Sequence, residues 1–229
     1  MNHLFENGKP QSIPVVLANR DRRVALQNQL TAKHPEQTLI AAKLNIPGPI
    51  KNNQTIRDFF AAGLAVFEKQ LAAKFQFRMA EQWLGESTGP ERFYLVDGPA
   101  AQVKQLTTEF EEAQAAHRLF DLDVLSRQNN QTVSISRTEL GLPKRQCLIC
   151  GQPAKECARS RRHSVAELQD RVAALIENYW CNNKSSNFWE ISSWSFCWFL
   201  VVEQISGQVA VAAIRRYRYD LLAFAQLLS

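Results

Sequence analysis

The chain has 229 residues and a mass of 26.1 kDa, enough for one sizeable domain or two small ones. Hydrophobic residues make up 45% and charged residues 21%, an ordinary globular composition that excludes a disordered chain, a collagen-like repeat and a small disulfide scaffold. The formal net charge is +5. A surplus of the same size lies within residues 143–163, where six lysines and arginines stand against Glu156 alone, and its sign favours an anionic partner.

Hydrophobic spacing predicts an alternation of helices and strands along the chain. Apolar residues three and four positions apart indicate helices, and apolar residues in alternate positions indicate strands. In chain order, the expected elements are a helix over residues 12–34, a strand over 40–46, a helix over 56–71, strands over 77–83 and 93–96, a helix over 99–112, a hairpin of strands over 119–125 and 132–137, and a helix that begins at 164. This order predicts an α+β domain with a small mixed sheet and flanking helices.

Two aspartates, Asp121 and Asp123, occupy alternate positions of one expected strand. Their side chains project from the same side of it, and the repulsion between them must be relieved by a proton, a cation or solvent. Paired oxygen ligands suit Mg²⁺, which completes its shell with phosphates and water. Arg118 could then hold a phosphate, and Glu139 is a candidate third carboxylate. The alternative is an exposed acidic strand face.

A second cluster combines Cys147, Cys150, Cys157 and His163. Three cysteines and a histidine supply the four ligands of a structural zinc knuckle, although the loop between the pairs is shorter than in most zinc fingers. The alternative is a set of reduced, partly buried cysteines in a basic loop. The neighbouring lysines and arginines are either an anion-binding surface or a solvated loop.

A turn over residues 47–51, rich in proline and glycine, separates an expected strand from a helix. It can aim Lys51 and the N-terminus of that helix at a phosphate, or it can be a rigid connection only. His3, His34 and His117 form no visible triad with a serine or cysteine, so the sequence does not support a hydrolase nucleophile.

The five cysteines and the N-terminal residues bear on the cellular compartment. An odd cysteine count with no visible signal peptide favours a reduced, cytoplasmic protein. The only membrane candidate is residues 188–214, which Glu190 and Glu203 interrupt, so no membrane association is expected.

Several segments together resemble the holo-citrate lyase synthase family, also called the apo-citrate lyase phosphoribosyl-dephospho-CoA transferases. They fall in the family's order over about three quarters of the chain, from Ser12 to Asn183. The matching segments are Ser12-Ile13-Pro14, Arg20-Asp21, Pro47 to Lys51, Arg118 to Val124, Ser136-Arg137, Leu142-Pro143, Arg145, Cys147-Leu148, Cys150, Ala154, Cys157 to Arg159, and His163.

The resemblance implies a nucleotidyltransferase and a nucleotidyltransferase-like fold. Its donor would be triphosphoribosyl-dephospho-CoA, its acceptor a serine of the acyl-carrier (gamma) subunit of apo-citrate lyase, and its second product pyrophosphate. By position, Asp121 and Asp123 would hold Mg²⁺ on the triphosphate, and Arg118 would steady a phosphate. Basic residues of the matching segments would bind the donor or the acyl-carrier subunit: Arg20, Lys51, Arg137, Arg145 and Arg159.

The chain departs from the family pattern in two places. His117 stands where members usually have a glycine, and it could donate to the phosphates or impair the site. Residues 184–229 form an atypical tail with 9 of the 22 aromatic residues, which suggests a changed reading frame or the remnant of a fusion. The expected domains are therefore residues 1–183 and the tail.

The alternative function is a zinc-knuckle nucleic-acid-binding protein. It would use the basic loop together with Arg215, Arg216 and Arg218 in the tail. With the transferase as the leading hypothesis, no nucleic-acid partner is expected.

Overall fold

The computed structural model describes residues 3–183, and its principal compact unit ends at Tyr179. The expected tail over residues 184–229 and the membrane candidate within it lie outside the described residues. The expected division of the chain at residue 183 therefore stays a prediction.

Five strands form one sheet in the order β2-β3-β1-β4-β5. They are β1 (Thr38–Leu44), β2 (Gln76–Trp83), β3 (Glu91–Asp97), β4 (Phe120–Gln128) and β5 (Gln131–Ser134). The α+β class is confirmed, but the expectation of a mixed sheet is wrong, because every neighbouring pair of strands is antiparallel. The central strand β1 pairs with β3 on one side and with β4 on the other, and both run antiparallel to it. Hydrophobic periodicity predicts where strands lie but not which strands pair.

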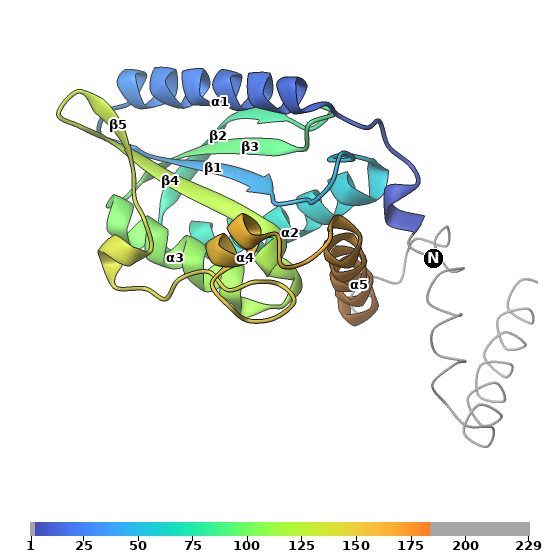
Figure 1. Cartoon of the computed structure of the whole chain (residues 1–229). Helices are drawn as coiled ribbons and strands as arrows, with labels where there is room; N and C mark the ends of the chain where they lie inside the picture. Colours follow the sequence, from blue (N-terminus) through green and yellow to red (C-terminus); the bar gives the residue numbers. More distant parts are fainter. Residues whose placement is uncertain (1–2, 184–229) are drawn as a thin grey trace, which may run out of the picture. The chain divides into compact units, whose positions relative to one another are not determined.

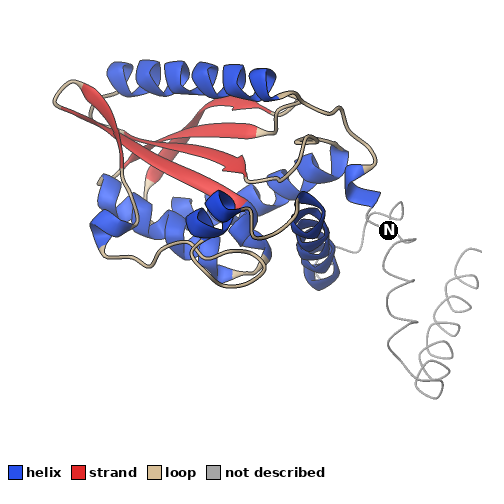
Figure 2. Ribbon diagram, viewed as in Figure 1, coloured by secondary structure: helices blue, strands red, loops and turns tan. Residues whose placement is uncertain are grey.

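Helices cover both faces of this sheet, with α1 on one face and α2 and α3 on the other (Figures 1 and 2). The α-helices are α1 (Ile13–Lys33), α2 (Gln54–Ala72), α3 (Ala100–Ala113), α4 (Ala154–Ser160) and α5 (Val165–Asn183). Short 3-10 helices are η1 (His3–Phe5), η2 (Ala116–Leu119) and η3 (Thr138–Leu140). The element order agrees closely with the order predicted from the sequence.

Local signals in the sequence explain where several elements begin or turn. The Asn53 side chain accepts a hydrogen bond from the Ile56 backbone N–H and caps α2. Ser164 and Glu167 exchange hydrogen bonds as a capping box at the start of α5. Asn129 and Asn130 both have positive φ and form the two-residue turn between β4 and β5.

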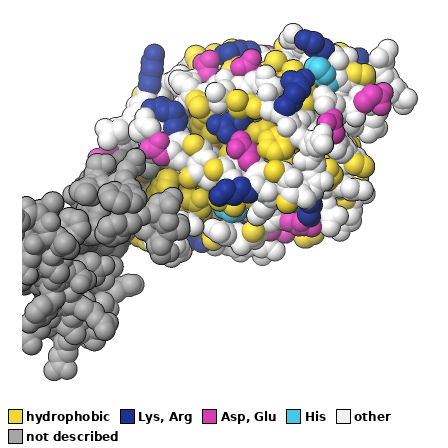
Figure 3. Space-filling model, turned by 180° about the vertical axis from the view of Figure 1, so that it is seen from behind, with side chains coloured by type: hydrophobic (Ala, Val, Ile, Leu, Met, Phe, Trp, Pro, Cys, Tyr) yellow, Lys and Arg dark blue, Asp and Glu magenta, His cyan; other side chains and the backbone are white. Residues whose placement is uncertain are grey.

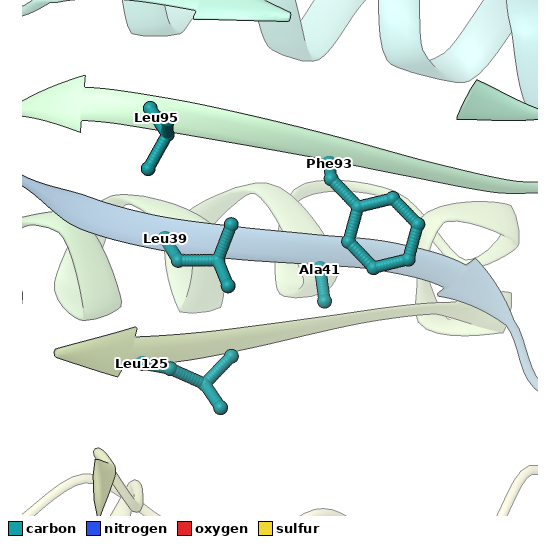
Figure 4. Close-up of a cluster of buried hydrophobic side chains, with 5 residues drawn as sticks. All are labelled: Leu39, Ala41, Phe93, Leu95 and Leu125. Carbon is teal, nitrogen blue, oxygen red and sulfur yellow. The ribbon is translucent and has the colours of Figure 1, made fainter. Parts of the chain in front are cut away.

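A compact hydrophobic cluster fills the space between α1 and the sheet. Its buried members come from three adjacent strands and lie side by side in Figure 4: Leu39, Ala41, Phe93, Leu95 and Leu125. Leu26 and Leu30 of α1 pack against them. Leu17 and Val24, which the sequence also marks as apolar positions of this helix, stay 48% and 45% exposed.

Aromatic side chains dominate the core on the opposite face. The ring of Phe120, at the start of β4, packs between Phe59 and Phe60 of α2 and Phe110 of α3. Tyr179 of α5 contacts Phe59 edge to face. The N-terminal end of β4, which carries the aspartate pair, is thereby packed against α2 and α3, and α5 packs against α2.

Gly63 of α2 lies directly against this core. A Cβ atom there would come within 2.2 Å of the Phe120 ring, closer than real side chains approach. We expect Gly63→Ala to lower the free energy of unfolding by about 1–3 kcal/mol through overpacking, despite the better helix propensity of alanine. Urea denaturation measures this, with Gly85→Ala as the control because a Cβ there meets open space. Equal stability of the two variants would contradict this packing.

Candidate active site

The two aspartates lie at the N-terminal half of β4, on the face of the sheet that α1 covers. In the register of β1 and β4, Lys43 stands opposite Asp121 and Ala41 opposite Asp123. Leu125, next on the same side of β4, belongs to the hydrophobic cluster beneath α1. The carboxylates are 33% and 40% exposed. The two aspartates therefore lie on the same face of β4 as Leu125, at its solvent-exposed end. The sequence predicts this shared face, because residues i and i+2 of a strand project from the same side.

Lys43 holds both carboxylates together. Its Nζ lies 2.7 Å from Oδ2 of Asp121 and 2.5 Å from Oδ2 of Asp123. Burial lowers the pKa of Lys43, but the charges and hydrogen bonds of the two aspartates outweigh it, so the net shift of this pKa is upward. Sequence reasoning missed this residue, because its role depends on the pairing of β1 with β4.

Arg145 supplies a second cation from a distant loop. Its Nη1 donates to Oδ1 of Asp121 at 3.1 Å, and its Nη2 donates to the carbonyls of Arg118 and Phe120. Burial raises the pKa of Asp121, but the Lys43 charge and hydrogen bond, followed by the Arg145 charge, outweigh it and hold this pKa below its usual value. Asp121 therefore stabilises the fold above its unfolded pKa, and this contribution is lost as the pH falls through its lower folded pKa.

Beside the aspartates, side chains instead of a neighbouring strand form hydrogen bonds with the backbone at the free edge of β4. β5 pairs only with the C-terminal part of β4. At Leu122, the Glu111 carboxylate accepts from the backbone N–H at 2.7 Å, and Lys104 Nζ donates to the carbonyl at 3.1 Å. Both side chains come from α3 and are buried. They fix the segment between the two aspartates where no strand does.

A cleft of about 240 Å³ opens next to this edge, on the side of α3. Its charged lining consists of Arg118, Arg137, Lys144 and Arg145 with Glu111 and Glu112. Arg137 forms ion pairs with both glutamates, and the four cations against two carboxylates leave the lining with a net charge of +2. On the face turned away in Figure 1, basic and acidic side chains are interspersed (Figure 3), whereas this cleft concentrates positive charge beside the aspartates.

The structure brings some predicted binding residues together at this cleft and places others elsewhere. Arg118 donates to the carbonyls of Gln146 and Cys147, so in this structure it holds the loop rather than standing free for a phosphate. Lys51 donates to the carbonyl of Ile46 at 2.5 Å and closes its own turn. Arg159 lies exposed on α4, and Arg20 lies exposed on α1.

His117 and Glu139 do not lie where the sequence analysis considered them, at a phosphate site and beside the aspartate pair. His117 is 1% exposed, stacks on Phe110 and contacts its carbonyl through Nδ1, so it lies in the core and not at a phosphate site. Burial lowers its pKa. Glu139 accepts from the Ser136 backbone N–H, and among the described residues it joins no metal-ligating cluster with the aspartates.

The predicted Cys/His cluster does assemble. One ligand atom each from Cys147, Cys150, Cys157 and His163 lie within 4.8 Å of one another. The Sγ atoms of Cys150 and Cys157 are 3.4 Å apart, and His163 Nε2 lies 3.2 Å from Cys150 Sγ. Tetrahedral zinc sets its ligand atoms roughly 3.5–4 Å apart, so this donor set fits a metal centre.

The thiols in this cluster have distinct acidities. A hydrogen bond from the Gln152 backbone, followed by one from His163, lowers the pKa of Cys150 to about 6. Burial, followed by contacts with the other two thiols, raises the pKa of Cys157 to about 11. Cys150 is thus a thiolate at neutral pH, and a bound metal would deprotonate the thiols of Cys147 and Cys157.

The cluster is joined directly to the aspartate site. Gln146 bridges to Pro153, and the Ala154 N–H donates to the carbonyl of Arg145 at 2.8 Å. Arg145, two residues before Cys147, reaches Asp121 from this folded knuckle. A carboxylate pair with cations and an arginine-lined cleft is suited to the transfer of a phosphorus-containing group.

Comparison with known proteins identifies the class more closely. The sequence profile of the apo-citrate lyase phosphoribosyl-dephospho-CoA transferases matches residues 11–179. The apo-citrate lyase phosphoribosyl-dephospho-CoA transferase of Escherichia coli O6:K15:H31 is 36% identical over 168 residues, which cover 73% of this chain and 89% of that protein. A probable transferase of the same name from Streptococcus pyogenes serotype M18 is 32% identical over 186 residues, covering 80% and 94%.

A third relative, Protein CitXG of Leuconostoc mesenteroides subsp. cremoris, is 34% identical over 178 residues. The match covers 76% of this chain but only 37% of that longer protein. The chain therefore belongs to the apo-citrate lyase phosphoribosyl-dephospho-CoA transferase family and is a transferase. Within residues 3–183, no helix has the length and apolar character that a membrane span requires.

Proposed function

We propose that this protein transfers phosphoribosyl-dephospho-CoA from triphosphoribosyl-dephospho-CoA to a serine of the acyl-carrier subunit of apo-citrate lyase. The observation that carries the proposal is the carboxylate pair Asp121 and Asp123 beside an arginine-lined cleft, in a chain of this family. The charged side chains that line the cleft carry a net charge of +2, which suits a polyphosphate. Family membership favours this transfer over the nucleic-acid-binding alternative.

In the proposed reaction, the serine Oγ attacks the α-phosphorus of the donor in line. A bond forms between Oγ and phosphorus while the bond from phosphorus to the pyrophosphate oxygen breaks, and pyrophosphate leaves with that electron pair. The serine proton passes to one carboxylate of the pair. Lys144 and Arg145 line the side from which the polyphosphate is held, and Arg118 supports their loop through the carbonyls of Gln146 and Cys147.

Asp121 and Asp123 are the proposed ligands of Mg²⁺. Bound there, the ion would neutralise charge on the transferring phosphates. The fit rests on hard oxygen donors and on Lys43, whose ammonium group already occupies a cation position between the two carboxylates. Lys43 would then turn to the phosphates that accompany the ion.

Lys43 is expected to compete with a divalent cation for the same oxygens. Lys43→Met removes that positive charge, so we expect about tenfold tighter binding of Mn²⁺, used as a probe for Mg²⁺, in calorimetric titrations. Lys74→Met, which removes an exposed pair with Glu109, should leave the affinity unchanged. Weaker or equal Mn²⁺ binding in Lys43→Met would argue against an ion between the two aspartates.

The second proposed metal is structural Zn²⁺ in the cluster of Cys147, Cys150, Cys157 and His163. Three thiols and an imidazole within 4.8 Å supply a complete tetrahedral shell with no open position. A closed shell of this kind favours a structural role over a catalytic one.

Intact-mass spectrometry of the apo acyl-carrier subunit tests the proposed function. The subunit is incubated with the full chain, triphosphoribosyl-dephospho-CoA and Mg²⁺. We expect a mass gain equal to phosphoribosyl-dephospho-CoA, and the gain should vanish when the donor is left out. An unchanged mass, with components that an established relative can modify, would refute the proposal.

A further inference from the structure

The helix α1 carries an apolar flank that nothing in the described structure covers. Ile13, Leu17 and Val24 are 76%, 48% and 45% exposed, and Arg20 lies between them at the same three- and four-residue spacing. Adjacent exposed aliphatic side chains on a helix are typical of a surface that meets another molecule.

Contacts of neighbouring residues show which way this flank faces. Arg22, on the opposite side of α1, lies 4.0 Å over the Trp83 ring and pairs with Glu86, beyond the β2 side of the sheet. Thr31, one helical repeat after Val24 and on its side, hydrogen bonds to Thr132 of β5 at 2.7 Å. The apolar flank therefore faces β4 and β5.

The same flank stands level with the aspartate pair. Asn19 and Arg23 of α1 both bind Glu91, which stands opposite Lys43 in the register of β1 and β3. Lys43 in turn holds Asp121 and Asp123 on the α1 face of the sheet. The flank and the carboxylates thus border one open surface, while the arginine-lined cleft lies on the α3 side of β4.

We propose that this flank of α1 docks the protein acceptor, an inference that rests on the proposed function. In-line transfer places the attacking oxygen and the leaving pyrophosphate on opposite sides of the phosphorus. Polyphosphate held at the cleft of Lys144 and Arg145 leaves the α1 side for the acceptor serine. A protein that approaches from this side meets the exposed side chains of Ile13, Leu17 and Val24.

The chemistry of the flank defines the partner surface that fits it. Arg20 forms no ion pair or hydrogen bond within residues 3–183, so it offers its charge to a partner. The neighbouring aliphatic side chains suit an apolar patch. The complementary acceptor surface is therefore apolar with at least one carboxylate near the modified serine.

Substitutions on the flank test this docking surface. We expect Arg20→Glu and the double variant Leu17→Ser/Val24→Ser to raise the KM for the acyl-carrier subunit about tenfold or more, with the KM for the donor within about twofold of wild type. Met79→Ser is the matched control, because Met79 is 48% exposed and lies opposite Tyr94 on the other face of the sheet.

Direct binding of the apo acyl-carrier subunit, measured by calorimetry without donor, separates this inference from the proposed function. Weaker binding in the flank variants alone supports the docking surface. Unchanged binding, or a rise in the KM for the donor instead, would overturn it even if wild-type transfer is observed. If the wild-type chain binds the subunit through the flank but transfers nothing, the proposed function fails and the docking surface stands.

Discussion

Asp121→Asn is expected to lower the rate of transfer at least about 100-fold while the protein remains folded. The amide keeps the shape of the side chain but removes a negative charge that faces Lys43 and Arg145 and that serves as a proposed Mg²⁺ ligand. The fold should persist because Lys43 keeps its ion pair with Asp123 at 2.5 Å. Single-turnover measurements of the acyl-carrier mass give the rate, and thermal unfolding gives the stability.

Asp97→Asn is the control for this substitution. Asp97 is an exposed aspartate at the end of β3, and it accepts a hydrogen bond from Gln37 but faces neither Lys43 nor Arg145. We expect its variant to transfer at the wild-type rate. Asp121→Asn with near-normal transfer would mean that the carboxylate pair is a structural acidic face, the alternative that its sequence pattern also allows.

Cys157→Ser is expected to remove bound zinc, from one ion per chain to none. Cys157 is a buried member of the cluster, and a hydroxyl cannot replace a thiolate in a closed tetrahedral shell. Zinc content by plasma mass spectrometry measures the loss directly. Cys181→Ser, outside the cluster, should retain the metal. A wild-type chain without zinc, or a Cys157 variant that keeps it, would contradict the site.

Loss of zinc should also disturb the contact between Arg145 and the aspartate pair. The knuckle holds Arg145 through the Ala154 N–H and the neighbouring bridge between Gln146 and Pro153. We therefore expect hydrogen exchange of Cys157→Ser to increase across residues 143–163 while the amides of β1 stay protected. Transfer should fall in parallel, since Arg145 is the residue of this described segment that contacts Asp121.

Much of the fold could be predicted from the sequence because its signals are local. The apolar spacing from Ile56 to Leu71 marks the buried face of α2, and the Asn129-Asn130 pair marks the β4–β5 turn. Strand pairing depends on which distant segments meet, so the antiparallel order around β1 could not be read from periodicity. The same limit explains α1, where Leu17 is exposed but Leu30 is half-buried against the hydrophobic cluster.

The residues of the candidate site likewise fall into those that the sequence predicts and those that it does not. Asp121 and Asp123 are placed together by strand geometry alone, and the Cys/His ligands are close in sequence, so both groups were predicted. The partners of Lys51 and Arg118 are backbone carbonyls, which carry no sequence signal. Lys43 was missed because its role appears only once β1 lies beside β4.

We propose that transfer takes place at the Asp121 and Asp123 pair. The most direct measurement is tandem mass spectrometry of the acyl-carrier subunit together with pyrophosphate determination in the same reaction. Wild-type protein should add one phosphoribosyl-dephospho-CoA group to a single serine for each pyrophosphate released, and the Asp121→Asn/Asp123→Asn double variant should do neither. Modification of the serine by the double variant, or modification without pyrophosphate, would contradict the claim.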